Sequence, residues 1–374
     1  MKLLYVVNEA QFFLSHRLPL GLEALARGFE VVVVTAPGTG EERLAQYGFR
    51  HIAVDMSRSD FILMSEIRTY RQLCEVYRAE QPDLVHHVTI KPVVYGSFAA
   101  RAADVATVVN AVPGMGFVFS RGGVLAAARR SFVNLLYRLA LAPANMRVIF
   151  QNSEDMRSFI DHRIVPRERA VLIRGAGVDL NEFVRTSEPD EPVTFVLPSR
   201  MIRDKGVVRF ALAAGSLRRD FPEWRFWLAG GVDPGNPAAL TEQELRDLEM
   251  RYGVTWLGHR EDVAQVIRDC HVVCLPTSYR EGLPKVLLEA AASGRAMVAS
   301  NIAGCREVVT EGVTGLLVEA DDIEGLRQAM QKLGEDPSLR ERCAAAARTK
   351  AEAVFSVEDV VEHTFRVYQE LLST

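Results

Sequence analysis

Two glutamates spaced eight positions apart lie in the stretch YREGLPKVLLEA (279–290), beside residues that suit the binding of an anion. Gly282 and Pro284 follow Glu281 closely, and an apolar run surrounds Glu289. Proline is favoured in the first turn of a helix, where backbone N–H groups lack intrahelical partners. We therefore predict a helix that starts at Pro284 and whose positive N-terminal end can face a phosphate.

The neighbours of Glu289 predict that its carboxylate is buried. An unpaired carboxylate is costly to bury, so this side chain requires partners such as ligand hydroxyls or backbone donors. Glu281 is different, because a glutamate in a loop can equally be solvated or face a ligand. The apolar neighbours of Glu289 are Leu287, Leu288, Ala290, Ala291 and Ala292.

Basic residues follow the first strand expected in the second half of the chain, in SRMIRDKG (199–206). Arg200 offers a two-pronged guanidinium and Lys205 a mobile ammonium, a pair that suits a diphosphate. Loop charges are often merely solvated, but ligands of open α/β sheets bind at the carboxyl ends of strands, where these two residues stand. In the turn LGHREDV, backbone groups near Gly258 and the side chain of Arg260 can hold a nucleotide base.

Composition and missing motifs argue against several other classes of protein. The 374-residue chain is 48% hydrophobic and 25% charged, which is typical of a globular protein long enough for two domains. Its longest apolar runs are only strand-length, so we expect no membrane span, no signal peptide and a cytoplasmic location. The five cysteines form no CxxC pair, which disfavours a disulfide framework and a zinc site. The dinucleotide, Walker, HExxH, GxSxG and DxD motifs are also absent from the sequence.

Strand and helix patterns alternate in two series, which predicts two doubly wound parallel-sheet α/β domains. Nearly all-apolar strands such as FEVVVVTA indicate sheets buried on both faces. We assign residues 1–184 to an N-terminal Rossmann-like domain, 185–192 to a polar linker and 193–354 to a C-terminal Rossmann-like domain. Residues 355–374 are predicted to form a final helix that can pack back on the N-terminal domain.

The combination of SRMIRDKG, WLGHREDV and EGLPKVLLEA resembles the retaining glycosyltransferases of family 4 over essentially the whole chain. The resemblance implies the GT-B fold, in which two Rossmann-like domains face a cleft, and the E-x7-E motif of that family. It implies that Arg200 and Lys205 grip the diphosphate of a nucleotide sugar. It further implies that Glu281 faces hydroxyls of the donor sugar and that Glu289 binds the ribose. Further donor contacts are expected at Gly282, Leu283, Lys285, Gly258 and Arg260.

The resemblance also implies a mechanism. The acceptor hydroxyl attacks the face of the sugar from which the diphosphate leaves, so the anomeric configuration is retained. We expect no cofactor and no metal, because the basic residues and the helix N-terminus neutralise the leaving diphosphate. A retaining glycosidase would instead need two carboxylates about 5 Å apart across the sugar, one of them a nucleophile. We therefore interpret both glutamates as residues that bind and position the donor and not as covalent nucleophiles. The residues assigned to the catalytic site are Glu281, Lys205 and Arg200.

The segment PDLVHHVTIKPVVYGSFAAR (82–101) resembles the subgroup that extends polyprenyl-diphosphate-linked sugars in bacterial O-antigen and protein-glycosylation pathways. That subgroup includes N-acetylgalactosaminyltransferases acting on lipid-linked diacetylbacillosamine, and it implies a UDP-sugar donor carrying an N-acetylhexosamine. Lys91 and Arg17 would then meet the diphosphate or sugar of the acceptor, with His16 and His87 as further candidates. For the histidine pair HH, the alternative is that one ring is packed and the other solvated.

A basic segment without acidic residues spans 105–153. Its mixture of arginine and leucine is typical of an interfacial helix, in which each basic residue near an anionic surface contributes roughly 1 kcal/mol. Such a helix more often faces a core and water, but a lipid-linked acceptor favours membrane contact. We therefore predict a peripheral location on the inner face of the cytoplasmic membrane, and no nucleic-acid partner. The arginines assigned to membrane contact are Arg121, Arg129, Arg130 and Arg138.

Two other functions remain open at this level. An epimerase or phosphorylase on the same fold would act on a sugar nucleotide without the proposed transfer. A non-catalytic subunit would bind the nucleotide sugar in support of a partner transferase. The complete set of Arg200, Lys205, Glu281 and Glu289 favours an active transferase.

Overall fold

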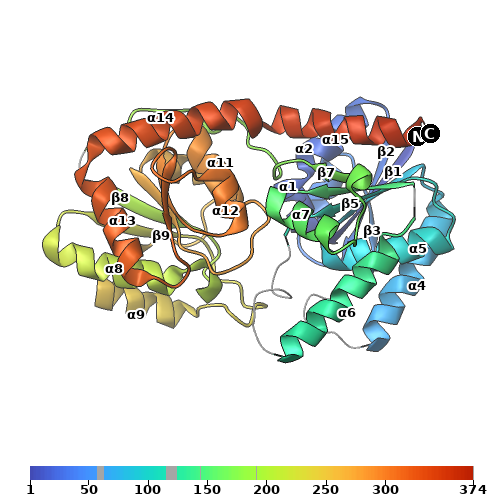
Figure 1. Ribbon diagram of the computed structural model, residues 1–374, viewed down its shortest axis with the longest axis horizontal. Coiled ribbons are helices and arrows are strands. Elements are labelled where there is room, and N and C mark those ends of the chain that lie inside the picture. The colour runs from blue at the N-terminus through green and yellow to red at the C-terminus, as the bar shows by residue number, and fades with distance from the viewer. Residues whose placement is uncertain (57–62, 115–123, 144, 191, 374) are drawn as a thin grey trace. The chain divides into compact units, whose positions relative to one another are not determined.

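Two parallel β-sheets form the centres of two separate units in the computed structural model of the protein (Figure 1). The structure describes residues 1–56, 63–114, 124–143, 145–190 and 192–373. The first unit comprises Met1–Ala176 and Glu358–Thr374, and the second comprises Gly177–Val357. The predicted fold class is confirmed.

The first sheet has seven strands in the order β3-β2-β1-β4-β5-β6-β7. Its central strands consist mainly of buried β-branched and other apolar residues, because helices cover both faces. The strands are β1 (Lys2–Glu9), β2 (Glu30–Ala36), β3 (Arg50–Ala53), β4 (Leu84–Val88), β5 (Val108–Val112), β6 (Met146–Phe150) and β7 (Ala170–Leu172).

Residues alternate between two hydrophobic cores along each strand of this sheet. Leu4 and Val6 pack into one core, while Leu3 and Tyr5 pack into the other. The second core also contains apolar residues of the final helix, and Figure 1 shows this helix, α15, alongside α2 in the first unit. The helical segments of the unit are α1 (Ala10–His16), α2 (Leu18–Ala26), α3 (Glu41–Gln46), α4 (Leu63–Glu80), η1 (Pro92–Gly96), α5 (Ser97–Ala102), α6 (Val124–Ala140), α7 (Ser153–Asp161), η3 (Arg167–Arg169) and α15 (Val357–Leu372).

The second sheet has six strands in the order β10-β9-β8-β11-β12-β13. Its strands are β8 (Thr194–Pro198), β9 (Arg225–Ala229), β10 (Thr255–Trp256), β11 (Val272–Leu275), β12 (Ala296–Ser300) and β13 (Gly315–Val318). Its helices are η4 (Arg203–Lys205), α8 (Val207–Asp220), α9 (Glu242–Tyr252), α10 (Val263–Arg268), α11 (Lys285–Ala292), α12 (Ala303–Val308), α13 (Ile323–Glu335) and α14 (Pro337–Val354).

The segment predicted as a polar linker is held against the second unit instead. Arg295 is fully buried and donates hydrogen bonds to the carbonyl oxygens of Thr186 (2.9 Å) and Ser187 (3.1 Å). Arg340 is also buried, and its Nε lies 3.0 Å from a carboxylate oxygen of Glu188. Residues 185–190 therefore pack on the second unit, because these guanidinium groups supply the polar partners that the segment needs.

The chain passes between the units at two places that lie side by side. The backbone N–H of Val178 donates to the carbonyl of Phe355 (2.9 Å), and that of Val357 donates to the carbonyl of Val178 (3.0 Å). Gly177 has a positive φ of 77°, and a Cβ there would lie 2.5 Å from the Cα of Val357. The division between the units thus falls at Ala176, eight residues before the predicted end of the first domain.

Candidate donor and acceptor sites

The predicted donor residues lie in the loops and the helix start that follow the carboxyl ends of the strands of the second sheet. The strand order reverses between β8 and β11, which is the topological switch point where ligands of doubly wound sheets bind. Lys205 follows β8 and Glu281 follows β11, so the two loops flank this point. Arg200 and Gly258 follow β8 and β10 at the same edge.

Lys205 and Glu281 form an ion pair in which Nζ contacts Oε1. Their side chains are only 15% and 12% exposed, so the pair is shielded from screening by solvent. The sequence placed both residues in loops, and the structure brings them together. At the switch point, the ammonium of Lys205 can bind a diphosphate, and the carboxylate of Glu281 can accept hydrogen bonds from hydroxyl groups.

The two loops are fastened to each other by residues that the sequence analysis missed. The hydroxyl of Thr277 donates to the carbonyl of Asp204 (3.0 Å), and the backbone N–H of Ser278 donates to the same oxygen (2.8 Å). Gly206 has a φ of 84°, and a Cβ there would lie 2.1 Å from the carbonyl oxygen of Pro276. The close approach explains the glycine of RDKG, and this glycine was the signal available in the sequence.

The loop that carries Glu281 rests on helix α12 and leads into α11. A Cβ at Gly304 would lie 2.5 Å from the carbonyl oxygen of Glu281 and 2.6 Å from that of Gly282. Helix α11 begins at Lys285, and Pro284 is its N-cap with extended backbone rather than its first residue. The predicted start was therefore one residue early. The first-turn N–H groups of α11, including that of Lys285, belong to the helix end that can meet an anion.

Glu289 is buried within α11, as its apolar neighbours predicted, with 7% of its surface exposed. Its carboxylate lies 3.2 Å from the ammonium of Lys285, one helical turn earlier. Burial raises the pKa of Glu289, the nearby Lys285 opposes the rise, and the charge of Glu182 adds to it. The carboxylate can therefore gain stability from ligand hydroxyls that donate hydrogen bonds to it.

The two arginines predicted to bind the donor are held by neighbouring carboxylates. Arg200 is half-exposed and pairs with Asp233, which follows β9 and was missed from the sequence. Arg260 makes a fork-like pair with Asp262, with Nε to Oδ1 at 2.7 Å. Exposed pairs of this kind are worth little, so a phosphate can displace the carboxylate at small cost.

His86 and His87 of β4 are both buried in the first unit. Adjacent residues of β4 point to opposite faces, and His87 is fully buried on the face covered by α4. Its Nδ1 lies 2.9 Å from Asn110 Oδ1, and its Nε2 lies 2.8 Å from the hydroxyl of Tyr77. Burial lowers the pKa of His87 to about 4. Both ring nitrogens are therefore used within the core, and a role of His87 in acceptor binding stays a prediction that would require one of these contacts to be exchanged.

Lys91 is also engaged within the protein. Its Nζ lies 2.7 Å from Oε1 of Glu66 on α4, and both side chains are 10% exposed. Lys91 thus belongs to a buried ion pair, and its contact with the diphosphate or sugar of the acceptor stays a prediction. His16 is half-buried and stacks on Phe12, with ring centroids 4.2 Å apart. Arg17 is buried between α1 and α2.

The basic segment is described only in part. Arg121 lies outside the described residues, and so do the side chains of Arg129 and Arg130 on α6. Arg138 is exposed and donates a 2.7 Å hydrogen bond to the carbonyl of His162. On the same helix the apolar side chains of Leu135 and Leu139 are 50% and 49% exposed.

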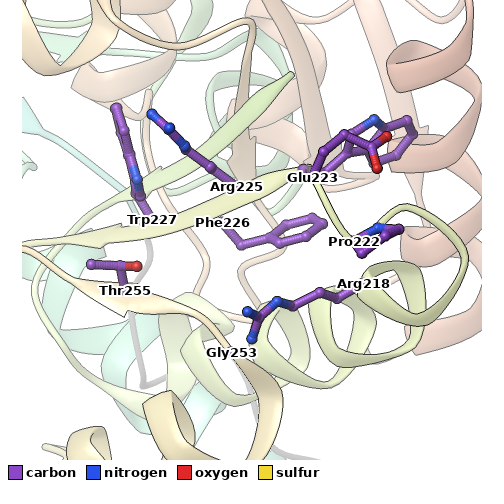
Figure 2. A pocket seen from close by; sticks show the side chains of 9 residues that line it. Arg218, Pro222, Glu223, Arg225, Phe226, Trp227, Gly253 and Thr255 are labelled. Atoms are coloured by element: carbon purple, nitrogen blue, oxygen red, sulfur yellow. The ribbon is translucent and has the colours of Figure 1, made fainter. Parts of the chain in front are cut away.

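A hollow of about 440 Å³ lies at the opposite edge of the second sheet (Figure 2). Arg225 and Thr255 in its lining begin β9 and β10, so it opens at the amino ends of these strands. It is separate from the loops that carry Lys205 and Glu281 and does not belong to the candidate donor site.

Two features are absent from the part of the chain that the structure describes. There, no helix combines the length and the apolar character that crossing a membrane requires. The same residues contain no cluster of three histidine, cysteine, aspartate or glutamate side chains that could hold a metal ion.

Two doubly wound parallel-sheet units, the second with basic residues and a helix start at its switch point, are the architecture of the GT-B fold. A glycosyltransferase from Rickettsia africae shares the fold with a TM-score of 0.78 and 16% identity, over 99% of this chain and 98% of that chain. Anabaena HepE in complex with UDP also has a TM-score of 0.78, with 20% identity over 99% and 100% of the two chains.

Sequence comparison identifies the family. Residues 2–152 match the family described as glycosyl transferase 4-like, and residues 179–350 match the family described as glycosyl transferases group 1. The chain belongs to the glycosyltransferases that combine these two domains, as the resemblance implied.

Two glycosyltransferases of known activity are similar to the chain in sequence. The N,N'-diacetylbacillosaminyl-diphospho-undecaprenol alpha-1,3-N-acetylgalactosaminyltransferase of Campylobacter jejuni is 26% identical over 360 residues, covering 91% of this chain and 93% of the relative. The UDP-Gal:alpha-D-GlcNAc-diphosphoundecaprenol alpha-1,3-galactosyltransferase of Escherichia coli is 26% identical over 293 residues, covering 74% of this chain and 73% of the relative.

Proposed function

We propose that the protein transfers a sugar, an N-acetylhexosamine, from a UDP-sugar to a polyprenyl-diphosphate-linked saccharide in the synthesis of a bacterial surface glycan or glycoprotein. The observation that carries the proposal is the shielded Lys205–Glu281 pair at the switch point of the second sheet. The names of both curated relatives give an undecaprenyl-diphosphate acceptor, which supports the acceptor class.

In this proposal Lys205, Arg200 and the first turn of α11 neutralise the diphosphate as it leaves. Arg200 exchanges its exposed partner Asp233 for a phosphate, and the ammonium of Lys205 is shared between Glu281 and the phosphate. Glu281 accepts hydrogen bonds from hydroxyls of the donor sugar. Backbone groups at Gly282 and Leu283 face the sugar, while Gly258 and Arg260 contact the nucleotide base.

Glu289 holds the ribose of the donor. Its buried carboxylate lies on α11, one turn beyond the helix start that faces the phosphates. The sugar therefore reacts at one end of α11 while the nucleoside is held along it. The acceptor hydroxyl attacks the face of the sugar from which the diphosphate leaves, so the anomeric configuration is retained. A diphosphate oxygen accepts the proton of this hydroxyl. No metal is needed, because the basic residues and the start of α11 neutralise the diphosphate. Both relatives are named for an α-1,3 linkage, which retention from an α-linked UDP-sugar would give.

We further propose that α6 meets an anionic membrane surface on the cytoplasmic side. Its exposed Leu135 and Leu139 are one turn apart, and Arg138 between them is exposed as well. No acidic residue occurs from 105 to 153 to repel anionic lipid. A lipid-linked acceptor would require such contact.

A transfer assay tests the function and the donor site together. The protein is incubated with a panel of nucleotide sugars and a bacterial lipid extract, UDP release is followed, and the product is identified by mass. We expect Lys205→Ala to lower transfer by about 10²-fold or more, because one transition-state cation is lost. Arg203→Ala is the matched control, since Arg203 lies in the same turn but pairs with Glu244 in solvent.

Three outcomes would contradict the proposal. Transfer that is unchanged in both Lys205→Ala and Glu281→Ala would overturn the site. Isomerisation or hydrolysis of the nucleotide sugar without an acceptor would favour the epimerase. Binding of UDP without turnover on any donor and acceptor would favour the non-catalytic subunit.

A further inference from the structure

Arg209, in the first turn of α8, connects segments that follow three different strands of the second sheet. Its guanidinium donates to the carbonyl of Pro276, just after β11, from Nε (3.1 Å) and Nη2 (2.9 Å). Nη2 also donates to the hydroxyl of Ser278 (3.2 Å), and Nη1 contacts the carboxylate of Asp321, beyond β13. One side chain, only 17% exposed, therefore ties α8 to the loop that carries Glu281 and to the turn before α13.

The carbonyl oxygen of Pro276 is the point at which the two loops of the candidate donor site meet. A Cβ at Gly206, the last residue before α8, would lie 2.1 Å from this oxygen. Arg209 donates to the same oxygen from the first turn of that helix. In return, the carbonyl of Asp204 in the loop after β8 accepts a 2.8 Å hydrogen bond from the backbone N–H of Ser278. Because each segment offers one carbonyl to donors from the other, the relative position of the two loops is fixed from both sides.

The set of acceptors around Arg209 matches the geometry of a guanidinium. Such a group carries five N–H donors in a fixed planar fork, whereas a lysine ammonium is a point charge with three donors. Nε and Nη2 share one carbonyl while Nη1 contacts a carboxylate, so these contacts set the orientation of the whole group. Arg219, on the same helix, is exposed and donates a 3.4 Å hydrogen bond to Ser216 within the helix. Arg209, by contrast, reaches the donor loops.

The effect of Arg209 on a bound donor would pass through these loops. Its three guanidinium nitrogens already donate to acceptors within the protein. Lys205 lies directly before Gly206 at the meeting point, and Glu281 lies further along the loop that begins with Pro276. A shift at the meeting point would therefore move the ammonium of Lys205 relative to the carboxylate of Glu281. A misplacement of about 1 Å at a reacting site can cost about 10²-fold in rate.

We propose that Arg209 is a positioning residue of the donor site, which holds Lys205 and Glu281 in the arrangement that sugar transfer requires. This role rests on the proposed function, in which Lys205 meets the charge that develops on the leaving diphosphate. Asp321 holds Nη1 of the same guanidinium. Because the Asp321 side chain is 70% exposed, its contribution should be much smaller than that of Arg209.

Measurements of transfer and of UDP binding on Arg209→Met test the proposal. We expect kcat to fall at least about tenfold, because Lys205 is no longer aligned in the transition state. The dissociation constant for UDP should rise by less than about threefold, since Arg200, Glu289 and the start of α11 also hold the ground state. Arg209→Lys should recover part of kcat, because it keeps the charge but not the fork. Arg219→Met is the matched control and should stay within about twofold of the wild type in both measurements.

Combining Arg209→Met with Lys205→Ala separates positioning from a general loss of stability. A lower fraction of folded protein would reduce transfer by the same factor in the wild-type and the Lys205→Ala backgrounds. If Arg209 acts through Lys205, its substitution should matter less once the ammonium is gone. We expect the factor to shrink to about threefold or less, because the effects of coupled residues do not add.

Hydrogen exchange without ligand tests the same contacts independently of the reaction. In Arg209→Met, the backbone N–H groups of residues 199–206 and 276–283 should exchange at least about tenfold faster than in the wild type. The N–H of Ser278, for example, then loses its fixed acceptor in the other loop. Helix α9 of the same unit should keep its rate of exchange. Arg219→Met should leave both loops at the rate of the wild type.

The outcomes distinguish the role of Arg209 from the proposed function. Unchanged exchange of both loops in Arg209→Met would overturn the inference, even if transfer is confirmed. Faster exchange with an unchanged kcat, or an equal loss of transfer in the wild-type and Lys205→Ala backgrounds, would overturn the positioning role as well. Faster exchange of both loops in a protein that transfers no sugar would leave Arg209 as the residue that positions them and contradict the function.

Discussion

At the scale of single residues, the burial of Glu289 leads to a prediction about pH. Its pKa is raised in the folded protein, so the folded state binds more protons than the unfolded state between the ordinary carboxyl pKa and the raised value. The stability of the wild type relative to Glu289→Gln should therefore be greatest at low pH and fall as pH rises through this window. Urea denaturation of both proteins from pH 4 to 7 measures the difference.

Glu324→Gln is the control for this experiment. Glu324 is exposed on α13, and Arg327 lowers its pKa to about 2, so its contribution is lost only as pH falls toward that value. We expect a flat difference for this variant between pH 5 and 7. A flat difference for Glu289→Gln as well would contradict the raised pKa of the buried Glu289 carboxyl.

The burial of a side chain was easier to predict from the sequence than its interaction partner. The apolar neighbours of Glu289 predicted its burial, since they are local in the chain. The partner of Lys91 is Glu66, 25 positions away on a different helix, and no spacing rule connects them. Asp233 was missed for the same reason, because only the order of the strands brings it to Arg200.

At the scale of elements, the segment 185–190 yields a prediction about stability. Glu188→Ala removes the partner of buried Arg340 and should lower the free energy of unfolding of the second unit by about 3 kcal/mol. The control Glu341→Ala breaks the exposed pair with Arg185 in the same segment and should cost less than about 1 kcal/mol. Equal small effects in urea denaturation would show that Glu188 does not hold this segment on the second unit.

Strand and helix periodicity predicted the elements well. Which elements cover each face of a sheet, and which loops meet at the strand ends, could be seen only in the folded structure. Alternation places the two histidines of β4 on opposite faces of the sheet, but it does not say that both faces are covered. The cover over His86 comes from α15, at the far end of the chain. The turn glycines Gly206 and Gly304 were visible in the sequence, but the loops they touch were not.

At the scale of the whole molecule, membrane binding should depend on the exposed apolar side chains of α6. The double variant Leu135→Gln, Leu139→Gln should sediment with vesicles of anionic phospholipid at least about tenfold less than the wild type, because two leucines no longer enter the lipid boundary. Met250→Gln is the control, since Met250 is 76% exposed on α9 in the second unit. Undiminished sedimentation of the double variant would count against contact through α6.

The return of α15 to the first unit has a consequence for biosynthesis. The core around Tyr5 and His86 needs Tyr368, and 181 residues (Gly177–Val357) separate the two stretches of this unit. A ribosome that adds about 5–20 residues per second needs roughly 10–40 s to make that insertion. During this interval the first sheet lacks α15, which covers part of one of its faces. The order of synthesis therefore lets the second unit fold first, and the first unit is completed only when α15 leaves the ribosome.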